Sequence, residues 1–78
     1  MRRVFTDDQL DEWKAYISGG QPGGSRAAQV MFVCLSSPKN RPRRAIHGSG
    51  DPAQAESELV HMEEAALIEL FKSAEPLA

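Results

Sequence analysis

The sequence of 78 residues has one cysteine, few aromatic residues and no long uninterrupted apolar stretch. Its longest apolar run, Val30 to Leu35, has six residues, whereas a helix that crosses a membrane needs about 20. We therefore expect no membrane-spanning segment. The first residues include two arginines but lack the apolar core of a secretion signal, which predicts a cytoplasmic protein.

A single cysteine excludes an internal disulfide bond. Cys34 lies inside the apolar run, and we interpret it as a reduced, buried small hydrophobic residue rather than a reactive thiol. The sequence also lacks the residue spacing of a zinc site or of a phosphate-binding loop. We therefore expect no catalytic residue, no cofactor and no metal ion.

The N-terminal part of the chain carries the signals of a helix over residues 7–18. Thr6 and Gln9 have the spacing of a capping box, and Phe5 and Leu10 have that of a hydrophobic staple. Apolar residues then recur at intervals of three and four. Two glycines should end this helix, and the glycine-rich segment that follows should form a loop.

The middle of the chain predicts two strands joined by a turn. Residues 27–35 are rich in β-branched and aromatic side chains, which is typical of a strand covered on both faces. Residues 36–42 contain two prolines and should reverse the chain direction. Residues 43–47 are then a shorter, half-exposed strand, so that the two strands form an antiparallel hairpin with a basic tip.

The C-terminal part predicts the longest helix, over residues 52–73. Asp51 is a good N-cap, Pro52 suits the first helical position, and Gln54 completes a capping box. No glycine or proline follows until Pro76. The apolar residues should form two stripes, one with Ala55, Leu59, Met62, Ala66 and Leu70 and the other with Val60, Leu67, Phe71 and Ala74.

Glu63 falls near the middle of this apolar arc, one heptad after Glu56. A lone buried carboxylate would be costly, so three interpretations are open. The arc could be two stripes with a solvated seam, Glu63 could form an ion pair with an arginine such as Arg44, or a partner could contact Glu63.

Together these elements predict an α+β fold, with a single domain over residues 1–78. The expected order is α-β-β-α, with a short antiparallel sheet covered by two helices. Because a two-stranded sheet alone is marginally stable, a third strand could come from the N-terminus or from a partner.

Charge is unevenly distributed along the chain. All 11 acidic residues lie within 7–12 or 51–75, and residues 13–50 carry only basic charges. The middle segment is +6 and the remainder −8, which gives the net charge of −2. Helix-end and solubility effects explain part of this segregation. The candidate binding residues are the acidic Asp7, Asp8, Asp11 and Glu12 and the basic Lys39, Arg41, Arg43 and Arg44.

A small α+β chain with polarised charge and no cofactor motif resembles the small phage-encoded inhibitors of bacterial defence systems, in particular the anti-CRISPR proteins. The resemblance is to a general profile over the whole chain, without a shared motif. It implies a non-catalytic inhibitor that binds a CRISPR surveillance complex and blocks its access to target DNA. Acidic helix faces would then occupy the basic nucleic-acid groove of this protein partner.

Two other functions are open. The basic turn, residues 39–44, could bind nucleic acid through phosphate contacts, although it lacks interleaved aromatic residues. The chain could also be a subunit of an assembly in which a partner completes its core. The charge pattern is compatible with any number of subunits.

Overall fold

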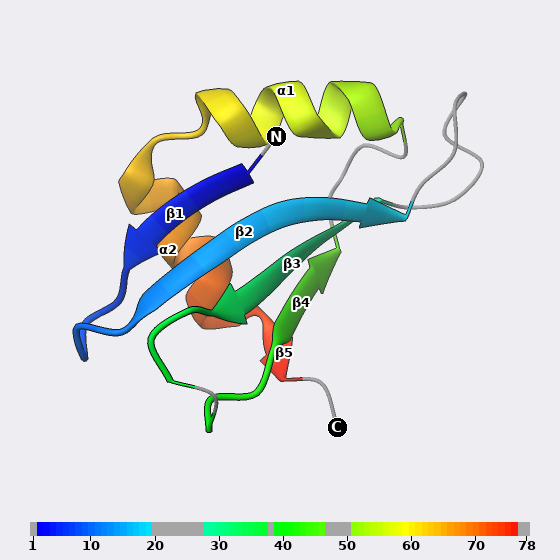
Figure 1. Ribbon diagram of the computed structural model, residues 1–78. Coiled ribbons are helices and arrows are strands. Elements are labelled where there is room, and N and C mark those ends of the chain that lie inside the picture. The colour runs from blue at the N-terminus through cyan, green and yellow to red at the C-terminus, as the bar shows by residue number, and fades with distance from the viewer. Residues whose placement is uncertain (1, 20–27, 38, 47–50, 77–78) are drawn as a thin grey trace.

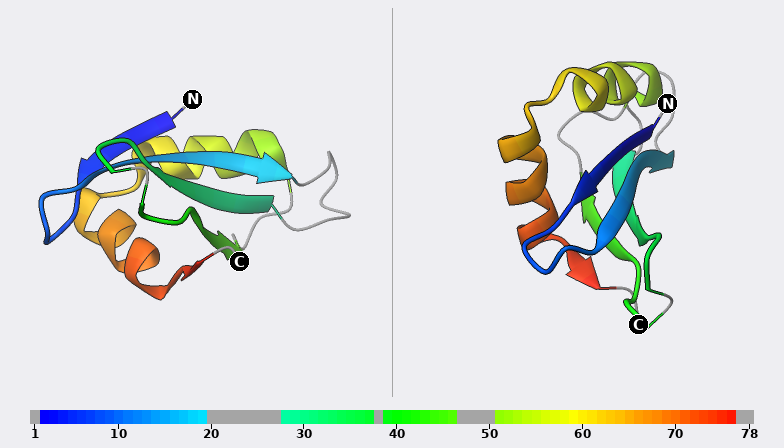
Figure 2. Two further views of the ribbon diagram at one scale, coloured as in Figure 1. Left: turned by 60° about the horizontal axis from the view of Figure 1, so that its bottom comes forward. Right: turned by 60° about the vertical axis from the view of Figure 1, so that its left-hand side comes forward.

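An antiparallel sheet forms one layer of the molecule, and two helices form the other (Figure 1). The computed structural model describes residues 2–19, 28–37, 39–46 and 51–76. Within them, five strands lie side by side in chain order, and both views of Figure 2 place the helices on the same side of the sheet. The elements are β1 (Arg2–Thr6), β2 (Glu12–Gly19), β3 (Ala28–Cys34), β4 (Arg43–Ile46), α1 (Pro52–His61), α2 (Glu64–Ser73) and β5 (Glu75–Pro76).

The α+β class predicted from the sequence is confirmed, but the α-β-β-α order is not. The helix predicted over residues 7–18 is wrong, because this segment forms a turn followed by β2. In β2 the burial alternates along the chain: Trp13 and Ala15 are buried, and Glu12 is exposed. The apolar positions therefore follow the two-residue period of a strand, which places one face of β2 against the helices.

The cap signals of the predicted first helix belong to the turn between β1 and β2. Thr6 is the last residue of β1, and the Leu10 amide donates a hydrogen bond to the Asp7 carbonyl over 3.1 Å. Leu10 has a φ of 66° and is 83% exposed, whereas Phe5 is in the core, so the predicted staple does not form. Short polar side chains favour turns for the same reason that they favour helix caps, because they bond to nearby backbone amides.

The two strands predicted in the middle of the chain are confirmed as β3 and β4, which pair antiparallel with Phe32 opposite Arg43. The prediction that β3 is covered on both faces is wrong. Val30 and Phe32 are buried against the helices, but Met31 between them is only half-buried on the other face. Residues 20–27 and 47, for which a loop and the end of the second strand were predicted, lie outside the described residues.

The long C-terminal helix is two helices, because Met62 and Glu63 have extended backbone conformations. At its start Asp51 is the N-cap as predicted, because its side chain accepts a hydrogen bond from the Ala53 amide over 3.3 Å. The predicted capping box does not form as expected, since Asp51 does not bond to the Gln54 amide and the Gln54 side chain donates to Glu58 Oε1 (3.5 Å). The two continuous apolar stripes do not form. Glu63 is exposed at the start of α2, and within the described residues it makes no ion pair with Arg44.

Arg3 stabilises the break between the helices. Its Nη1 donates hydrogen bonds to the carbonyls of Leu59 (3.0 Å), Val60 (3.3 Å) and Met62 (2.6 Å). These carbonyls lie where α1 ends and the chain turns into α2, and the carbonyls of a last helical turn have no amide donors in a following turn. The Leu59 carbonyl also accepts a hydrogen bond from the Met62 amide over 3.3 Å. A cation is also favourable at the negative end of the helix dipole.

The core lies between the two layers. Its buried residues are Phe5, Trp13, Ala15, Val30, Phe32, Leu59, Leu67, Phe71 and Ala74.

No helix in the described ranges is long and apolar enough to cross a membrane.

The two faces of the sheet predict different costs of truncation. Phe32, which is fully buried, should lose about 3 to 5 kcal/mol of unfolding free energy on replacement by Ala. Ile46, which is 71% exposed on the other face, should change it by no more than about 0.5 kcal/mol. Urea denaturation of both variants measures the difference, and equal effects would contradict the assignment of the faces.

The neighbouring arginines Arg2 and Arg3 provide a second test. Arg3→Leu removes the donor from three carbonyls and should lower the unfolding free energy by about 1.5 to 3 kcal/mol. Arg2→Leu is the matched control when both variants are unfolded at a dilution where the chain is monomeric, because Arg2 is exposed and lies on the opposite face of the sheet from Arg3. Comparable unfolding midpoints for the two variants would show that the carbonyl contacts are not stabilising.

Candidate functional site

Acidic and basic candidates that are far apart in the sequence lie at one end of the sheet. The β1–β2 turn and the described part of the β3–β4 connection are adjacent there (Figure 1). A cavity of about 340 Å³ opens between them and the end of α2. Asp7, Asp8, Asp11, Arg41 and Arg43 all line it, whereas Glu12, Lys39 and Arg44 do not.

Asp7 organises this end of the molecule. Its Oδ1 accepts hydrogen bonds from the amides of Gln9 (2.8 Å) and Asp11 (2.9 Å), and its Oδ2 accepts one from Trp13 Nε1 (2.8 Å). Partial burial raises the pKa of the Asp7 carboxyl, but these hydrogen bonds and the charge of Arg43 lower it more. The net pKa lies below the ordinary value of 3.8, so the carboxylate is a structural anion.

Asp11 joins the turn to the β3–β4 connection. Its carboxylate accepts hydrogen bonds from Ser36 Oγ (3.2 Å) and Asn40 Nδ2 (3.0 Å). Asp8 lies 3.5 Å from Lys72 Nζ, and both side chains are largely exposed. Because an exposed ion pair contributes little to stability, Asp8 stabilises the fold least of the three carboxylates.

The basic residues do not form one patch. The Arg43 guanidinium lies over the rings of Phe71 (4.4 Å) and Trp13 (5.6 Å), on the helix side of β4. Arg44 is exposed on the other face of the same strand. Because successive strand residues point to opposite faces, Arg43 and Arg44 lie on opposite sides of the sheet. Lys39 and Arg41 are exposed in the adjoining connection.

Cys34 is half-buried at the edge of the core, so its prediction as a buried residue is correct only in part. Asn40 Nδ2 donates a hydrogen bond to its Sγ over 3.4 Å, and Ser36 Oγ lies 3.7 Å away. Partial burial raises the pKa of the thiol, while hydrogen bonds from Asn40, Ser36 and the backbone of Ser37 lower it more, so the net pKa is lowered.

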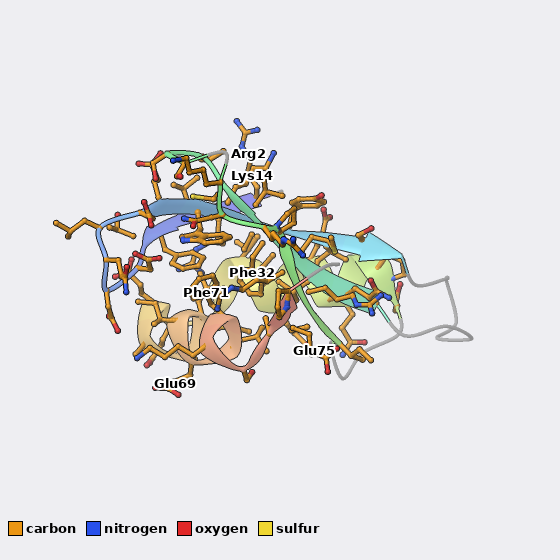
Figure 3. All side chains as sticks on the ribbon, turned by 90° about the horizontal axis from the view of Figure 1, so that it is seen from below. Arg2, Lys14, Phe32, Glu69, Phe71 and Glu75 are labelled. Atoms are coloured by element: carbon orange, nitrogen blue, oxygen red, sulfur yellow. The ribbon has the colours of Figure 1, made fainter. Side chains whose placement is uncertain are left out.

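The face of the sheet away from the helices is uncovered by any described residue. Figure 3 shows Arg2 and Lys14 on this side, with Phe32 and Phe71 between the layers. Sequence reasoning missed this surface, because it expected two strands rather than five. We call it the open face; from strand register it contains Arg2, Val4, Thr6, Glu12, Lys14, Tyr16, Ser18, Gln29, Met31, Val33, Arg44, Ile46 and Glu75.

The outer side of the helix layer carries carboxylates. Figure 3 shows Glu69 pointing away from the sheet. We use the name acidic helix side for the exposed carboxylates of the helix layer, which are Glu58 of α1, Glu63 between the helices, and Glu64 and Glu69 of α2.

No protein-family model, curated protein or solved structure matches this chain. Within the described residues, no three histidine, cysteine or carboxylate side chains are grouped to hold a metal ion.

The hydrogen bonds of Asp7 predict acid sensitivity. A carboxyl whose pKa is lowered by folding stabilises the folded state above its unfolded pKa, and this contribution disappears as the pH falls through the folded pKa. Asp7→Asn should therefore be less stable than the wild type at pH 7, with the difference shrinking below pH 3.8. Urea denaturation across this range measures the effect. A stability difference independent of pH would contradict it.

Proposed function

We propose that the protein is a non-catalytic binding protein that presents its acidic helix side to a basic surface on a protein partner. The observation that carries this proposal is the exposure of Glu58, Glu64 and Glu69 on two consecutive helices and of Glu63 between them. Like charges on rigid elements attract an oppositely charged surface and orient it before contact.

The proposed surface differs from the acidic segment that the sequence suggested. Asp7 and Asp11 use their carboxylates to hold the turn and the neighbouring connection, which leaves fewer acceptor positions for a partner. The helix carboxylates are exposed instead, and Glu69 points away from the sheet (Figure 3). They are therefore the better candidates for contact with basic side chains.

The proposed partner is a CRISPR surveillance complex, as the resemblance to anti-CRISPR proteins implies. Its nucleic-acid groove is positively charged because it must attract phosphates. A rigid row of carboxylates would compete for the same cations, and occupation of the groove would exclude target DNA. This mechanism needs binding only, without any chemical step.

The alternative is direct binding of nucleic acid by residues 39–44. The structure leaves Lys39 and Arg41 exposed, but it stacks Arg43 on aromatic rings and turns Arg44 to the opposite face. Fewer cations are then available at one place for adjacent phosphates. This function remains a testable second outcome.

A charge-reversal experiment separates the two. The protein is added to a purified, RNA-loaded surveillance complex, and binding of a matching DNA duplex is measured by band shift. The wild type should prevent the shift. Replacement of Glu58, Glu63, Glu64 and Glu69 by Lys should abolish this inhibition, because the cations of the groove would then face cations.

The control variant carries Lys39→Glu and Arg41→Glu and should inhibit as well as the wild type. Melting curves establish that each variant is folded before the assay. If the wild type leaves the complex fully active but shifts the duplex by itself, and the control variant does not, the basic connection is the functional surface and the proposal is wrong.

A further inference from the structure

One row of side chains crosses all five described strands on the open face. Strand register places Arg2 opposite Tyr16, Tyr16 opposite Met31, Met31 opposite Arg44, and Arg44 opposite Glu75. Residues that are directly opposite in antiparallel strands share a face. The row therefore reads, across the sheet, as cation, aromatic, thioether, cation and anion.

The charged side chains of this row form no ion pair with any residue that the structure describes. Among the described residues, neither Arg2, Arg44 nor Glu75 forms an ion pair, and Lys14 Nζ lies 5.3 Å from the centre of the Tyr16 ring. Apolar side chains flank the row: Val4 is 50% exposed and Ile46 is 71% exposed. A contiguous surface of this kind is typical of an interaction site, and arginine, tyrosine and methionine are enriched in protein interfaces.

We propose that a second copy of this chain covers the open face, with a two-fold axis parallel to β3. Rotation by 180° about such an axis keeps β3 over β3 and exchanges β2 with β4 and β1 with β5. Arg2 then faces Glu75 of the second copy, Tyr16 faces its Arg44, and Met31 faces its Met31. Each contact between different residues occurs twice.

Each of these contacts brings together chemical groups that attract each other. Arg2 and Glu75 have opposite charges, Arg44 meets an aromatic ring, and two methionines pack together on the axis. Val33 also meets Val33, because it lies on β3 one step along the same face. The arrangement pairs every member of the row without bringing two like charges into register.

The twist of the sheet agrees with this symmetry. A rotation preserves the hand of the twist, and an axis parallel to the central strand leaves strands that face each other parallel. The two open faces can then stack at the usual spacing of about 10 Å at their centre, where β2, β3 and β4 of the two copies meet. Arginine and glutamate side chains at the edges are long enough to meet across this distance.

The charge order distinguishes a second copy from other occupants. A nucleic acid or a uniformly acidic protein would be attracted to Arg2, Lys14 and Arg44 but repelled by Glu75 and Glu12 on the same face. A second copy presents the opposite charge at each end of the row. The inference does not depend on the proposed function, because it concerns the opposite side of the molecule from the acidic helix side.

The decisive experiment is a charge swap measured by sedimentation velocity and light scattering over a concentration series. The wild type should dimerise reversibly, with a limiting mass twice the 8.6 kDa of the chain. Arg2→Glu and Glu75→Arg should each weaken dimerisation about tenfold or more, because each places like charges together at two symmetric positions. The double variant should recover most of the wild-type affinity.

The recovery is specific to this arrangement, because Arg2 and Glu75 lie on opposite edge strands of one molecule and are not neighbours there. Lys39→Glu is the matched control for Arg2→Glu, since it makes the same change of charge outside the open face, and it should leave the dimer intact. Met31→Glu should abolish the dimer, because two carboxylates would meet on the axis.

Circular dichroism melts establish that each variant is folded. A wild type that stays monomeric throughout the series, or a double variant no better than the single ones, would overturn the proposal. So would a wild-type monomer that binds a single-stranded oligonucleotide through Arg2 and Lys14, since the open face would then belong to a nucleic acid.

Discussion

Phe71 is the contact on which the two layers depend. Its ring lies 5.3 Å from that of Phe5, 4.7 Å from that of Trp13 and 5.4 Å from that of Phe32, and the Arg43 guanidinium lies 4.4 Å above it. These partners come from β1, β2, β3 and β4, so one side chain of α2 touches four strands. Aromatic side chains bury large areas, and edge-on ring pairs add to that stabilisation. The position of α2 over the sheet follows from this cluster.

The sequence predicted those elements whose signals have one meaning. Asp51 and Pro52 start a helix in almost any context, and the β-branched run of β3 leaves little room for another structure. The segment before it was ambiguous. Trp13 and Ile17 are four residues apart, an interval that places two side chains on one face of a helix and equally on one face of a strand. Only tertiary pairing decides between these periods.

The charged site was less predictable than the fold, because charge along a chain does not show which groups are engaged. In the sequence Asp7 and Asp11 look like a free acidic cluster, but the fold places the Trp13 ring nitrogen beside Asp7 and the Asn40 amide beside Asp11. Arg3 has no local signal at all, since the carbonyls that it binds lie 56 or more residues away. The sequence lists the charged groups. Only the fold shows which of them are bonded within the protein and which are exposed to solvent.

The bond between Arg3 and the end of α1 also has a consequence for how the chain folds. Arg3 precedes Leu59 by 56 residues, so the ribosome must synthesise α1 before the cation of β1 has its carbonyl partners, and β5 follows later still. Pairing between such distant segments is slow to form. Until the helices are made, β1–β3 would present an apolar face without cover, and transiently exposed apolar surface of this kind favours aggregation.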